Sequence, residues 1–461
     1  MAVYPLFVVS PNTIVSLVGY MRGPDKTVAV PAEDYRQAKV DVVIPCLNEE
    51  RNITLALASV ARQTMPPRRI ILVDDGSLDR TVEFAQEFCH VNGIELMAIR
   101  RRQPIGKTPT IKRQAREFDS DVEFILDADT VLESDNYIER TVEELYKAVG
   151  IASACGIIMP QRTRDRDRFG RTTAMQRFLV NHPEGRVFEE RSGVRRFLRG
   201  ITNLYRETLY VYLQRFIYRG QMTFFGSISG PIGCAVAYRR QYVENLFDKY
   251  EPIMGDDLTN SEDVFLGLAS LNEGHRNIQL QDVVARTEEP EFQRLHKQLY
   301  LWSSAFLQSA FYFDGLMWSP FKSLRRIVNG DWRRNRPRAF DEKRRVAEPY
   351  RQAFGEEITK RRGRPMGWVL LMGVVEKLFF PAFIIIMVAL GLWEALLVTI
   401  VAEILLASTL LAISAPRQRV EYFLKCILIT PIRYATLMLD FVTAMRFAAD
   451  LWIFGTRKWR K

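Results

Sequence analysis

Residues 69–77 read Arg-Ile-Ile-Leu-Val-Asp-Asp-Gly-Ser, an apolar run that ends in two carboxylates and a turn. A short apolar run bounded by turn residues is typical of a buried β-strand. Similar runs, each of which predicts a strand, are Val40–Cys46, Ile94–Ile99 and Glu123–Leu126. The last of them ends at Asp127-Ala128-Asp129, and stretches with helical spacing separate the runs. Strands that alternate with helices predict a parallel sheet that binds ligands at the carboxyl ends of its strands.

The chain has 461 residues, of which 48% are hydrophobic, and its polarity changes sharply along its length. Residues 1–320 have the mixed composition of a globular protein. Residues 320–364 carry 15 Lys and Arg against 6 Asp and Glu, and this excess of 9 is nearly the whole net charge of +10. From Met366 onward the chain is apolar. This order indicates an enzyme, then a basic segment beside a membrane, then membrane segments.

The basic segment bears on the partners of the protein. A basic stretch beside membrane segments usually lies on an anionic membrane surface, and it also suits an anionic polymer or a lipid pyrophosphate. Nucleic-acid binding is the alternative interpretation, but we expect no nucleic-acid partner because the excess charge has this local origin. The five cysteines and four histidines are scattered without metal-ligand spacing. We therefore expect reduced thiols on the cytosolic side and no zinc site.

Two tracts, Met366–Leu392 and Glu394–Ala415, are each long enough to cross a bilayer, which takes about 20 residues. A third apolar tract, Tyr422–Gly455, is interrupted by charged residues. Because a charge at mid-bilayer costs roughly 2.5–3.5 kcal/mol on insertion scales, we expect these side chains to face protein or water. Pairing between helices and a polar path through the membrane both remain open. Residues 1–21 show no signal-peptide pattern and form a weak candidate for a membrane span.

These changes in composition divide the chain into four parts. We expect an N-terminal interfacial segment over 1–39 and a catalytic domain over 40–290. An amphipathic and basic juxtamembrane region over 291–365 follows, and transmembrane or interfacial helices occupy 366–461. Within the catalytic domain, residues 161–199 are rich in Arg and Asp and predict a long inserted loop.

Acidic side chains gather at the predicted carboxyl edge of the sheet. A single residue separates Asp127 from Asp129, so both can share a divalent cation that holds a diphosphate, and oxygen ligands suit Mg²⁺ or Mn²⁺. Asp75 can accept a hydrogen bond from a ring N–H of a base, whereas a helix cap or an Asx turn is the structural alternative for residues 74–77. Lys107 lies in a glycine-containing turn and either neutralises a phosphate or is a solvated surface lysine.

A further acidic pair, Glu262-Asp263, begins an apolar, helix-like run that ends at Gly274. An inverting sugar transfer needs one general base that takes a proton from the acceptor hydroxyl, and positive charge that stabilises the departing diphosphate. Asp263 suits the first role, and Asp129 with its metal suits the second. The preceding acidic run, Asp256-Asp257, competes for the role of base, with a solvated acidic loop as its structural alternative.

Taken together, these motifs resemble those of the family 2 glycosyltransferases, in particular the membrane-embedded processive synthases of the hyaluronan, chitin and cellulose type. The resemblance implies an α/β fold: a GT-A (Rossmann-like) cytosolic glycosyltransferase domain, followed by amphipathic interfacial helices and C-terminal transmembrane helices. The motifs that carry it are Val43–Glu50, Asp74–Ser77, Gly106-Lys107, Asp127–Asp129, Ser229–Pro231 with Tyr238–Arg240, and Ser261–Asp263.

The resemblance also implies roles for individual residues. Asp263 would be the catalytic base, which the position of Gly274 twelve residues after Glu262 favours over Asp257. Asp129 would hold the metal ion, Mg²⁺ or Mn²⁺. The residues implied to bind the nucleotide or donor are Pro45, Asn48, Glu50, Asp75, Lys107 and Asp127. Those implied on the acceptor and diphosphate side are Gly230, Pro231, Glu262, Gln298 and Trp302.

One motif departs from the family pattern Gln-x-x-Arg-Trp. Gln298 and Trp302 match it, but Leu301 occupies the position of the arginine that contacts the diphosphate. The neighbouring basic residues Arg294, His296 and Lys297 are candidates to replace it. Trp302 offers a flat face for the terminal acceptor sugar, with an interfacial tryptophan as the structural alternative. The departure leaves processivity and the acceptor open.

We therefore expect inverting transfer from a UDP-sugar to a growing β-linked polysaccharide at the membrane, with possible translocation of the product. The expected partners are a UDP-sugar donor, a polysaccharide or lipid-linked acceptor, membrane lipids and possible export proteins. The expected location is the cell (inner) membrane, with the catalytic domain in the cytosol. One alternative is non-processive transfer of a single sugar to a lipid carrier or glycolipid, and another is a catalytically silent scaffold of a secretion complex.

Overall fold

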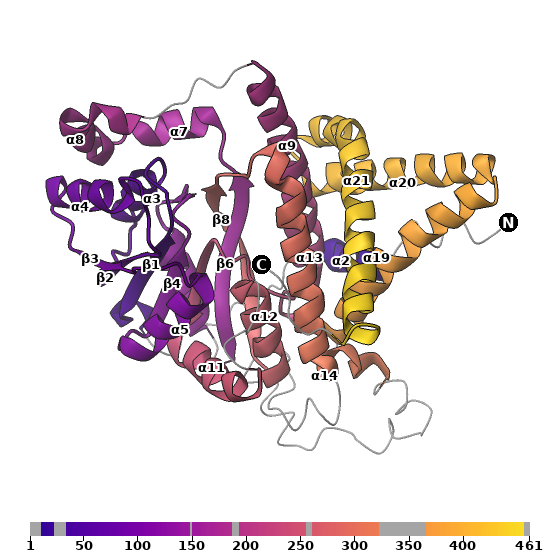
Figure 1. Ribbon diagram of the computed structural model, residues 1–461, viewed down its shortest axis with the longest axis horizontal. Coiled ribbons are helices and arrows are strands. Elements are labelled where there is room, and N and C mark those ends of the chain that lie inside the picture. The colour runs from indigo at the N-terminus through magenta and orange to yellow at the C-terminus, as the bar shows by residue number, and fades with distance from the viewer. Residues whose placement is uncertain are drawn as a thin grey trace.

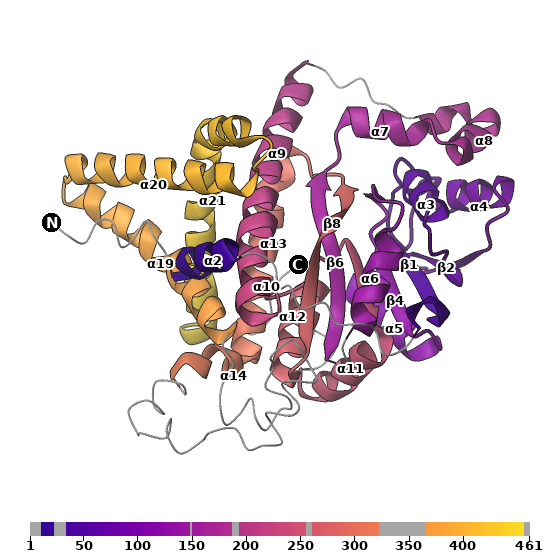
Figure 2. The same ribbon diagram turned by 180° about the vertical axis from the view of Figure 1, so that it is seen from behind.

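The computed structural model describes residues 11–22, 34–147, 150–186, 193–254, 261–321 and 366–455. A sheet with its covering helices lies on one side of the molecule, and three long helices lie on the other (Figure 1). Two further long helices, α9 (Gly193–Tyr212) and α13 (Leu295–Tyr312), run between these two parts (Figures 1 and 2). The three outer helices are α19 (Met366–Ala389), α20 (Trp393–Ser414) and α21 (Arg419–Trp452).

Within the described residues, eight strands form one sheet in the order β3-β2-β1-β4-β7-β6-β8-β5. The first four strands of this order pair in parallel. Strand β7 is antiparallel to both of its neighbours, β6 and β8 are parallel, and β5 is antiparallel to β8. The strands are β1 (Val40–Cys46), β2 (Arg69–Asp74), β3 (Leu96–Arg100), β4 (Val122–Leu126), β5 (Thr130–Leu132), β6 (Ile151–Pro160), β7 (Ala235–Arg239) and β8 (Arg276–Thr287).

Helices cover both faces of the sheet, as the continuous apolar runs of its parallel strands require. In β1, Val42 and Ile44 belong to one buried apolar cluster and Val43 belongs to the other. Successive side chains of a strand point to opposite faces, so both faces of the sheet are buried at β1. The helices of this domain are α3 (Ile53–Ala61), α4 (Thr81–Val91), α5 (Lys107–Glu117), α6 (Tyr137–Tyr146), α11 (Arg240–Met254) and α12 (Glu262–Glu273).

The prediction of a loop over residues 161–199 was wrong for most of that segment. It contains the helices α7 (Thr163–Gly170) and α8 (Thr173–Asn181), and α9 begins within it. Phe178 of α8 is fully buried and its ring packs edge-on against Phe84 of α4, with 5.5 Å between ring centroids. The many charged residues of the segment concealed this small apolar face, which is sufficient to fix α8 on the domain.

Helix α9 continues without a break through a π-helical segment, η3 (Leu213–Tyr218), into α10 (Arg219–Phe225). Gln214 in this segment is fully buried, and its side-chain amide pairs with the backbone of Ile158 in β6 at 2.7 and 2.8 Å. The continuous helix is therefore anchored directly to the sheet. The remaining short elements are α2 (Pro11–Arg22), η1 (Tyr35–Gln37), η2 (Pro183–Arg186), η4 (Phe292–Arg294) and α14 (Asp314–Met317).

In the described part of the chain, three helices are long and apolar enough to cross a membrane: Val369–Ala389, Trp393–Ser414 and Arg419–Trp452, with mean hydropathies of 2.2, 2.5 and 1.4. Large apolar side chains such as Leu397 and Leu428 are exposed on these helices, as expected of helices that contact lipid. The charged residue Lys425 instead pairs with Glu207 of α9 at 2.9 Å. This pair has the inward-facing placement that the sequence predicts for charges in these tracts.

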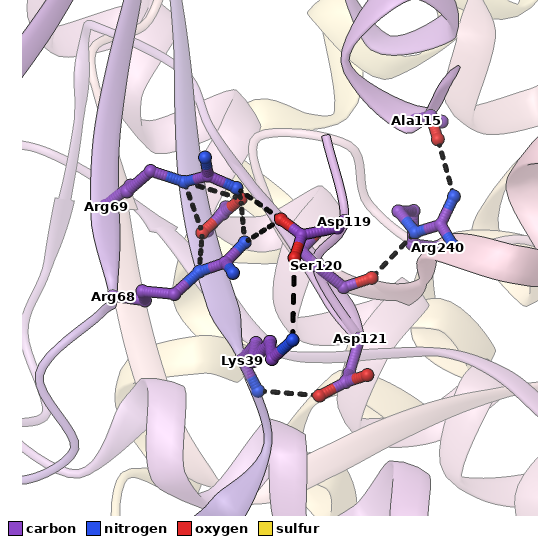
Figure 3. Close-up of polar contacts among 9 residues, drawn as sticks. Lys39, Arg68, Arg69, Ala115, Asp119, Ser120, Asp121 and Arg240 are labelled. Atoms are coloured by element: carbon purple, nitrogen blue, oxygen red, sulfur yellow. Dashed lines mark hydrogen bonds and ion pairs between the residues drawn. The ribbon is translucent and has the colours of Figure 1, made fainter. Parts of the chain in front are cut away.

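A cluster of ion pairs holds the amino ends of the first strands together (Figure 3). The Asp41 carboxylate at the start of β1 is 2% exposed and lies 2.9 Å from Arg68 Nη2 and 2.8 Å from Arg69 Nη2. Asp119 joins both arginines at 3.1 Å, and Arg240 donates to the carbonyl of Ser120 at 2.7 Å. These contacts hold together the amino ends of the parallel strands, on the side of the sheet opposite to their carboxyl ends.

Candidate active site

Lys107, the first residue of α5, brings together residues from three other segments. Its Nζ lies 2.6 Å from Asp127 Oδ1 and 2.7 Å from Glu262 Oε1, and it donates to the carbonyl of Gly233 at 3.0 Å. Burial disfavours the ammonium form, but the charges of Asp127 and Glu262 outweigh burial and raise the pKa of Lys107 well above its usual value. Lys107 is therefore not a solvated surface lysine. The carboxyl end of β4 and the amino end of α12 meet at its ammonium group.

Asp263 is held by hydrogen bonds to both of its carboxylate oxygens. Oδ2 accepts from the backbone N–H of Gly233 at 3.1 Å, and Oδ1 accepts from the backbone N–H of Val264 at 2.8 Å and from the Ser261 hydroxyl. Asp263 lies in the first turn of α12, where the helix dipole favours a carboxylate. The predicted helix end is confirmed, because Gly274 closes α12 in the left-handed conformation with a φ of 99°.

Small residues allow the turn before β7 to contact α12 through its backbone. A Cβ atom on Gly267 of α12 would lie 2.6 Å from Gly230 Cα and 3.0 Å from Pro231 Cδ. A Cβ atom on Gly233 would lie 2.8 Å from Asp263 Cβ and 2.9 Å from its Oδ2. The predicted residues Gly230 and Pro231 therefore lie against the helix that carries Asp263, and Gly233 leaves just enough room for that side chain.

The surroundings of Asp129 suit a divalent cation. Its Oδ1 accepts from the hydroxyls of Thr130 and Thr287 at 3.2 and 3.3 Å. Burial, together with the charges of Asp127 and Glu49, raises the pKa of Asp129 well above its usual value. Burial also raises the pKa of Glu49 to about 6. Several carboxylates that disfavour one another's ionisation are stabilised by a shared positive charge.

Among the described residues, no group of three or more His, Cys, Asp or Glu side chains is arranged to hold a metal ion. A Mg²⁺ ion in a nucleotide site is usually held by one or two carboxylates, with water and phosphate oxygens completing its shell. Asp127 and Asp129 fit that arrangement, because they are oxygen ligands one residue apart at the end of β4. The metal role of Asp129 stays a prediction.

Asp75 fastens the loop that carries Lys107. Its carboxylate accepts from the backbone N–H groups of Ile105 and Gly106 at 2.9 and 2.8 Å and from Arg101 at 3.0 Å. Burial opposes ionisation, but these donors together lower the pKa of Asp75. The turn alternative applies to the neighbouring Asp74, which accepts from the Ser77 N–H at 3.0 Å. Contact between Asp75 and a nucleotide base stays a prediction.

The predicted nucleotide residues of the opening strand lie where the loops after β1 and β2 meet. Asn48 has a left-handed backbone with a φ of 57°, and its Oδ1 accepts from the N–H of Leu78 at 2.9 Å. Glu50 accepts from the N–H of Arg80 at 3.1 Å, and Pro45 lies in β1 beside Val73 of β2. These residues shape the two loops, and their contact with a nucleotide stays a prediction.

Arg206 of α9 was not predicted from the sequence, although it is fully buried beside the altered Gln-x-x-x-Trp motif. Its guanidinium lies 3.0 Å from Glu289 Oε2 and 4.3 Å from the centre of the Trp302 ring, and it donates to Gln298. The three candidates Arg294, His296 and Lys297 are exposed. The basic group at this motif therefore comes from a helix about 90 residues upstream, and no spacing rule in the sequence points to it.

Glu288, directly after β8, was also missed. Its Oε1 lies 2.8 Å from Arg199 Nη2, and its Oε2 accepts from Asn52 at 2.9 Å and lies 3.3 Å from Arg166. Its backbone N–H donates to the carbonyl of Asp129 at 3.1 Å. Glu288 thus ties α7, α9 and the loop after β1 to the candidate metal residue. Asp256 and Asp257, the competing candidates for the base, lie outside the described residues.

Residues 41–247 match the model of a protein family that is described as Glycosyl transferase family 2. The chain carries a family 2 glycosyltransferase domain. Over 140 residues it is 29% identical to the undecaprenyl-phosphate 4-deoxy-4-formamido-L-arabinose transferase of Proteus mirabilis, which covers 30% of this chain and 40% of that relative. Over 136 residues it is 26% identical to the poly-beta-1,6-N-acetyl-D-glucosamine synthase of Staphylococcus epidermidis, covering 29% of this chain and 32% of the relative. The matched parts are therefore less than half of either relative.

The fold of the family 2 domain and its attached helices is similar to that of a solved mannosyltransferase from Pyrobaculum calidifontis, determined in complex with GDP-Man and Mn²⁺. That likeness has a TM-score of 0.50 at 16% identity and covers 98% of each chain. The predicted GT-A α/β domain, followed by C-terminal helices apolar enough to span a membrane, is confirmed. These helices also indicate that the family 2 domain belongs to a membrane protein.

Proposed function

We propose that this chain is an inverting glycosyltransferase that moves a sugar from a UDP-sugar to a growing β-linked polysaccharide at the membrane. The observation that carries the proposal is the set of contacts around Lys107, which joins Asp127, Glu262 and the turn that holds Asp263. A sugar transfer with a diphosphate leaving group requires a positive charge near the diphosphate and a general base. The Lys107 ammonium can supply the positive charge, and the Asp263 carboxylate, held by backbone donors, can supply the base.

In the proposed reaction, Asp263 takes the proton of the acceptor hydroxyl as its oxygen attacks the anomeric carbon from the face opposite to the diphosphate. The new glycosidic C–O bond forms, the bond to the diphosphate oxygen breaks, and UDP leaves with that electron pair. Lys107 stabilises the negative charge that develops on the diphosphate. When bound by Asp129 and Asp127, Mg²⁺ or Mn²⁺ supplies further positive charge to the diphosphate. Asn48, Glu50 and Asp75 shape the nucleotide side.

The acceptor side is proposed to include Gln298 and Trp302 of α13 together with Gly230 and Pro231 of the turn before β7. Trp302 is 39% exposed although Arg206 covers one of its faces, so an aromatic surface is left for a sugar ring. The family 2 domain would lie on the cytosolic side of the inner membrane, where UDP-sugars are made. Export of a polymer would then require translocation by the helices of this chain or by partner proteins.

Non-processive transfer of one sugar to a lipid carrier or glycolipid is the second candidate. Leu301 favours it, because the family motif has an arginine there. The relatives include both kinds of protein by name, a polysaccharide synthase and a transferase that acts on undecaprenyl phosphate. A catalytically silent scaffold is disfavoured by the carboxylates and the lysine gathered at Lys107.

The test measures UDP release by the purified full-length protein with a panel of UDP-sugars, with Mn²⁺, with Mg²⁺ and with a chelator. We expect release from one donor, dependent on the metal, together with long chains of the transferred sugar. A single sugar attached to lipid would replace the polymer proposal with the second candidate. Asp263→Asn should lower the rate about 10²–10⁴-fold, the usual contribution of a general base. Asp248→Asn, an exposed acidic residue of α11, is the matched control.

A further inference from the structure

Helix α2 lies beside α10 and α19 and is bonded to the end of α20 (Figure 2). The Tyr20 hydroxyl of α2 donates to the carbonyl of Ile413, in the last turn of α20, at 2.8 Å. The 22 residues of α20 form a helix about 33 Å long, close to the thickness of the hydrocarbon core of a bilayer. When α20 spans a membrane, Ile413 and the turn that follows it therefore lie at the membrane surface.

Two arginines on the side of the catalytic domain lie at this place. Arg219 of α10 holds its guanidinium carbon 4.6 Å from the centre of the Tyr20 ring, a cation–π contact. Arg215, one helical turn before it in η3, lies close enough to the Tyr422 hydroxyl of α21 for its positive charge to act on that group. Both arginines are only partly buried. The continuous helix that is anchored to the sheet therefore brings positive charge to the end of α20.

Two further arginines lie where α20 is joined to α21. Arg417 and Arg419 follow Ile413 closely in the sequence, and both are exposed. The connection at the other end of α20, residues 390–392, has no lysine or arginine. Basic residues concentrate in the short cytosolic loops of membrane proteins. This difference favours the cytosolic surface of the membrane for the end of α20 that carries the arginines.

None of these four arginines forms an ion pair within the part of the chain that the structure describes. Two carboxylates of the neighbouring helices are already paired, because Glu207 of α9 lies 2.9 Å and Glu421 of α21 lies 2.5 Å from the ammonium group of Lys425. Uncompensated positive charge at the cytosolic surface attracts the anionic head groups of that leaflet. The four residues form the arginine cluster: Arg215, Arg219, Arg417 and Arg419.

Helix α2 adds an exposed apolar face beside the arginine cluster. Ile14, Val18 and Met21 are 51%, 36% and 78% exposed. Their spacing of four and three residues places them on one face of the helix. Another face is closely packed, because a Cβ atom on Gly19 would lie 2.5 Å from the carbonyl oxygen of Gly220 in α10. A helix with an exposed apolar face suits the boundary between the head groups and acyl chains of a membrane.

We propose that the arginine cluster and the exposed face of α2 together bind an anionic phospholipid of the cytosolic leaflet. The guanidinium groups donate hydrogen bonds to the phosphate oxygens, and the acyl chains lie along Ile14 and Val18. Charge complementarity and the position at the end of a candidate membrane helix together select a lipid over a soluble anion. This inference concerns binding and does not depend on the proposed sugar transfer.

The first test compares two lipids that share both acyl chains and the phosphate group. The full-length protein in detergent micelles is incubated with equal amounts of dioleoylphosphatidylglycerol and dioleoylphosphatidylcholine, and the retained lipids are quantified by mass spectrometry after removal of excess. The choline group cancels the phosphate charge, so the comparison isolates the net charge of the head group. We expect the phosphatidylglycerol to be retained at least about tenfold more. Equal retention, or a preference for phosphatidylcholine, overturns the proposal.

The second test asks whether the arginine cluster causes the preference. The double variant Arg417→Gln with Arg419→Gln changes two exposed side chains. One basic residue at an anionic membrane surface strengthens binding about fivefold, so we expect the preference for phosphatidylglycerol to fall at least about fivefold. The control, Arg36→Gln with Arg177→Gln, removes the same charge from exposed positions of the catalytic domain and should keep the wild-type ratio. An unchanged ratio in the folded Arg417→Gln, Arg419→Gln variant overturns the proposal.

The third test asks whether the bound group is a lipid on α2. Ile14→Ser with Val18→Ser makes the exposed face polar and should reduce retention of phosphatidylglycerol several-fold, whereas Ile14→Leu with Val18→Leu should retain it. Equal retention by the two folded variants overturns the placement of the acyl chains on α2. An excess of inorganic phosphate, compared with sodium chloride at the same ionic strength, should leave the lipid bound. Displacement by phosphate alone would show a site for the free anion and overturn the choice of a lipid.

Discussion

Gly233→Ala adds a single methyl group beside the proposed base. That methyl carbon would lie 2.8 Å from Asp263 Cβ and 2.9 Å from its Oδ2. Ordinary contacts between non-bonded carbon atoms are about 3.5–4.0 Å, so the Asp263 side chain must move by roughly 1 Å. The backbone of Gly233 does not have a positive φ, so alanine suits its conformation. The substitution therefore perturbs the position of the carboxylate while keeping its chemistry.

The expected effect on catalysis follows from this displacement. A misplacement of about 1 Å in a reacting group can cost about 10²-fold in rate, which corresponds to about 2.7 kcal/mol in the activation barrier. The 3.1 Å hydrogen bond from the Gly233 N–H to Oδ2 should also weaken. Overpacking costs about 1–3 kcal/mol of stability in a closed core, and we expect the lower end because the Asp263 side chain is only partly buried.

The assay is the initial rate of UDP release from the donor that the wild type uses, with kcat and KM determined separately. We expect kcat to fall about 10²-fold with little change in the KM of the donor, because the base acts in the transition state. Gly200→Ala is the matched control, since a Cβ atom there has nothing within 4 Å. A wild-type kcat in folded Gly233→Ala protein would refute the assignment of Asp263 as a base that needs this exact placement.

Two further predictions concern stability. Arg206→Met leaves Glu289 buried without its ion-pair partner, so it should lower the free energy of unfolding by about 3–5 kcal/mol, measured by thermal or denaturant unfolding. Adding Glu289→Gln should recover part of that loss. If the double variant is no more stable than Arg206→Met, the ion pair is not the cause. Burial raises the pKa of Glu123 well above its usual value, so the native state holds this proton more tightly than the unfolded state. The resulting stabilisation is complete below about pH 4.3 and is lost as the pH rises toward the raised pKa. Glu123→Gln should remove this dependence and flatten the pH profile of the melting temperature, and an unchanged profile would contradict it.

The sequence was sufficient to predict the parallel half of the sheet. Strands β1, β2 and β4 are short, mostly apolar runs followed by polar turns, and that pattern needs no knowledge of distant residues. The antiparallel half was not predicted. Strand β5 has only three residues, and β8 carries polar side chains along much of its length. Their pairing depends on contacts between segments about 150 residues apart, and local sequence patterns do not predict such contacts.

The candidate site also contains residues that the sequence predicted and residues that it did not. The resemblance to a family selected Lys107, Asp127, Glu262 and Asp263 as functional residues, and the structure brings these residues together. Arg206 and Glu288 could not be predicted, because their partners lie on other helices and strands. The role of a buried arginine is decided by the groups that it contacts, and the composition of α9 does not show which groups these are.

The contacts of Lys107 have a consequence for how ligands influence one another. Its ammonium group is shared between Asp127, on the side proposed for the donor, and Glu262, on the side proposed for the acceptor. A diphosphate that draws the ammonium toward itself must weaken at least one of these contacts and so change the charge felt on the other side. Donor and acceptor affinities are then linked, and by thermodynamic reciprocity each ligand changes the affinity of the other by the same factor.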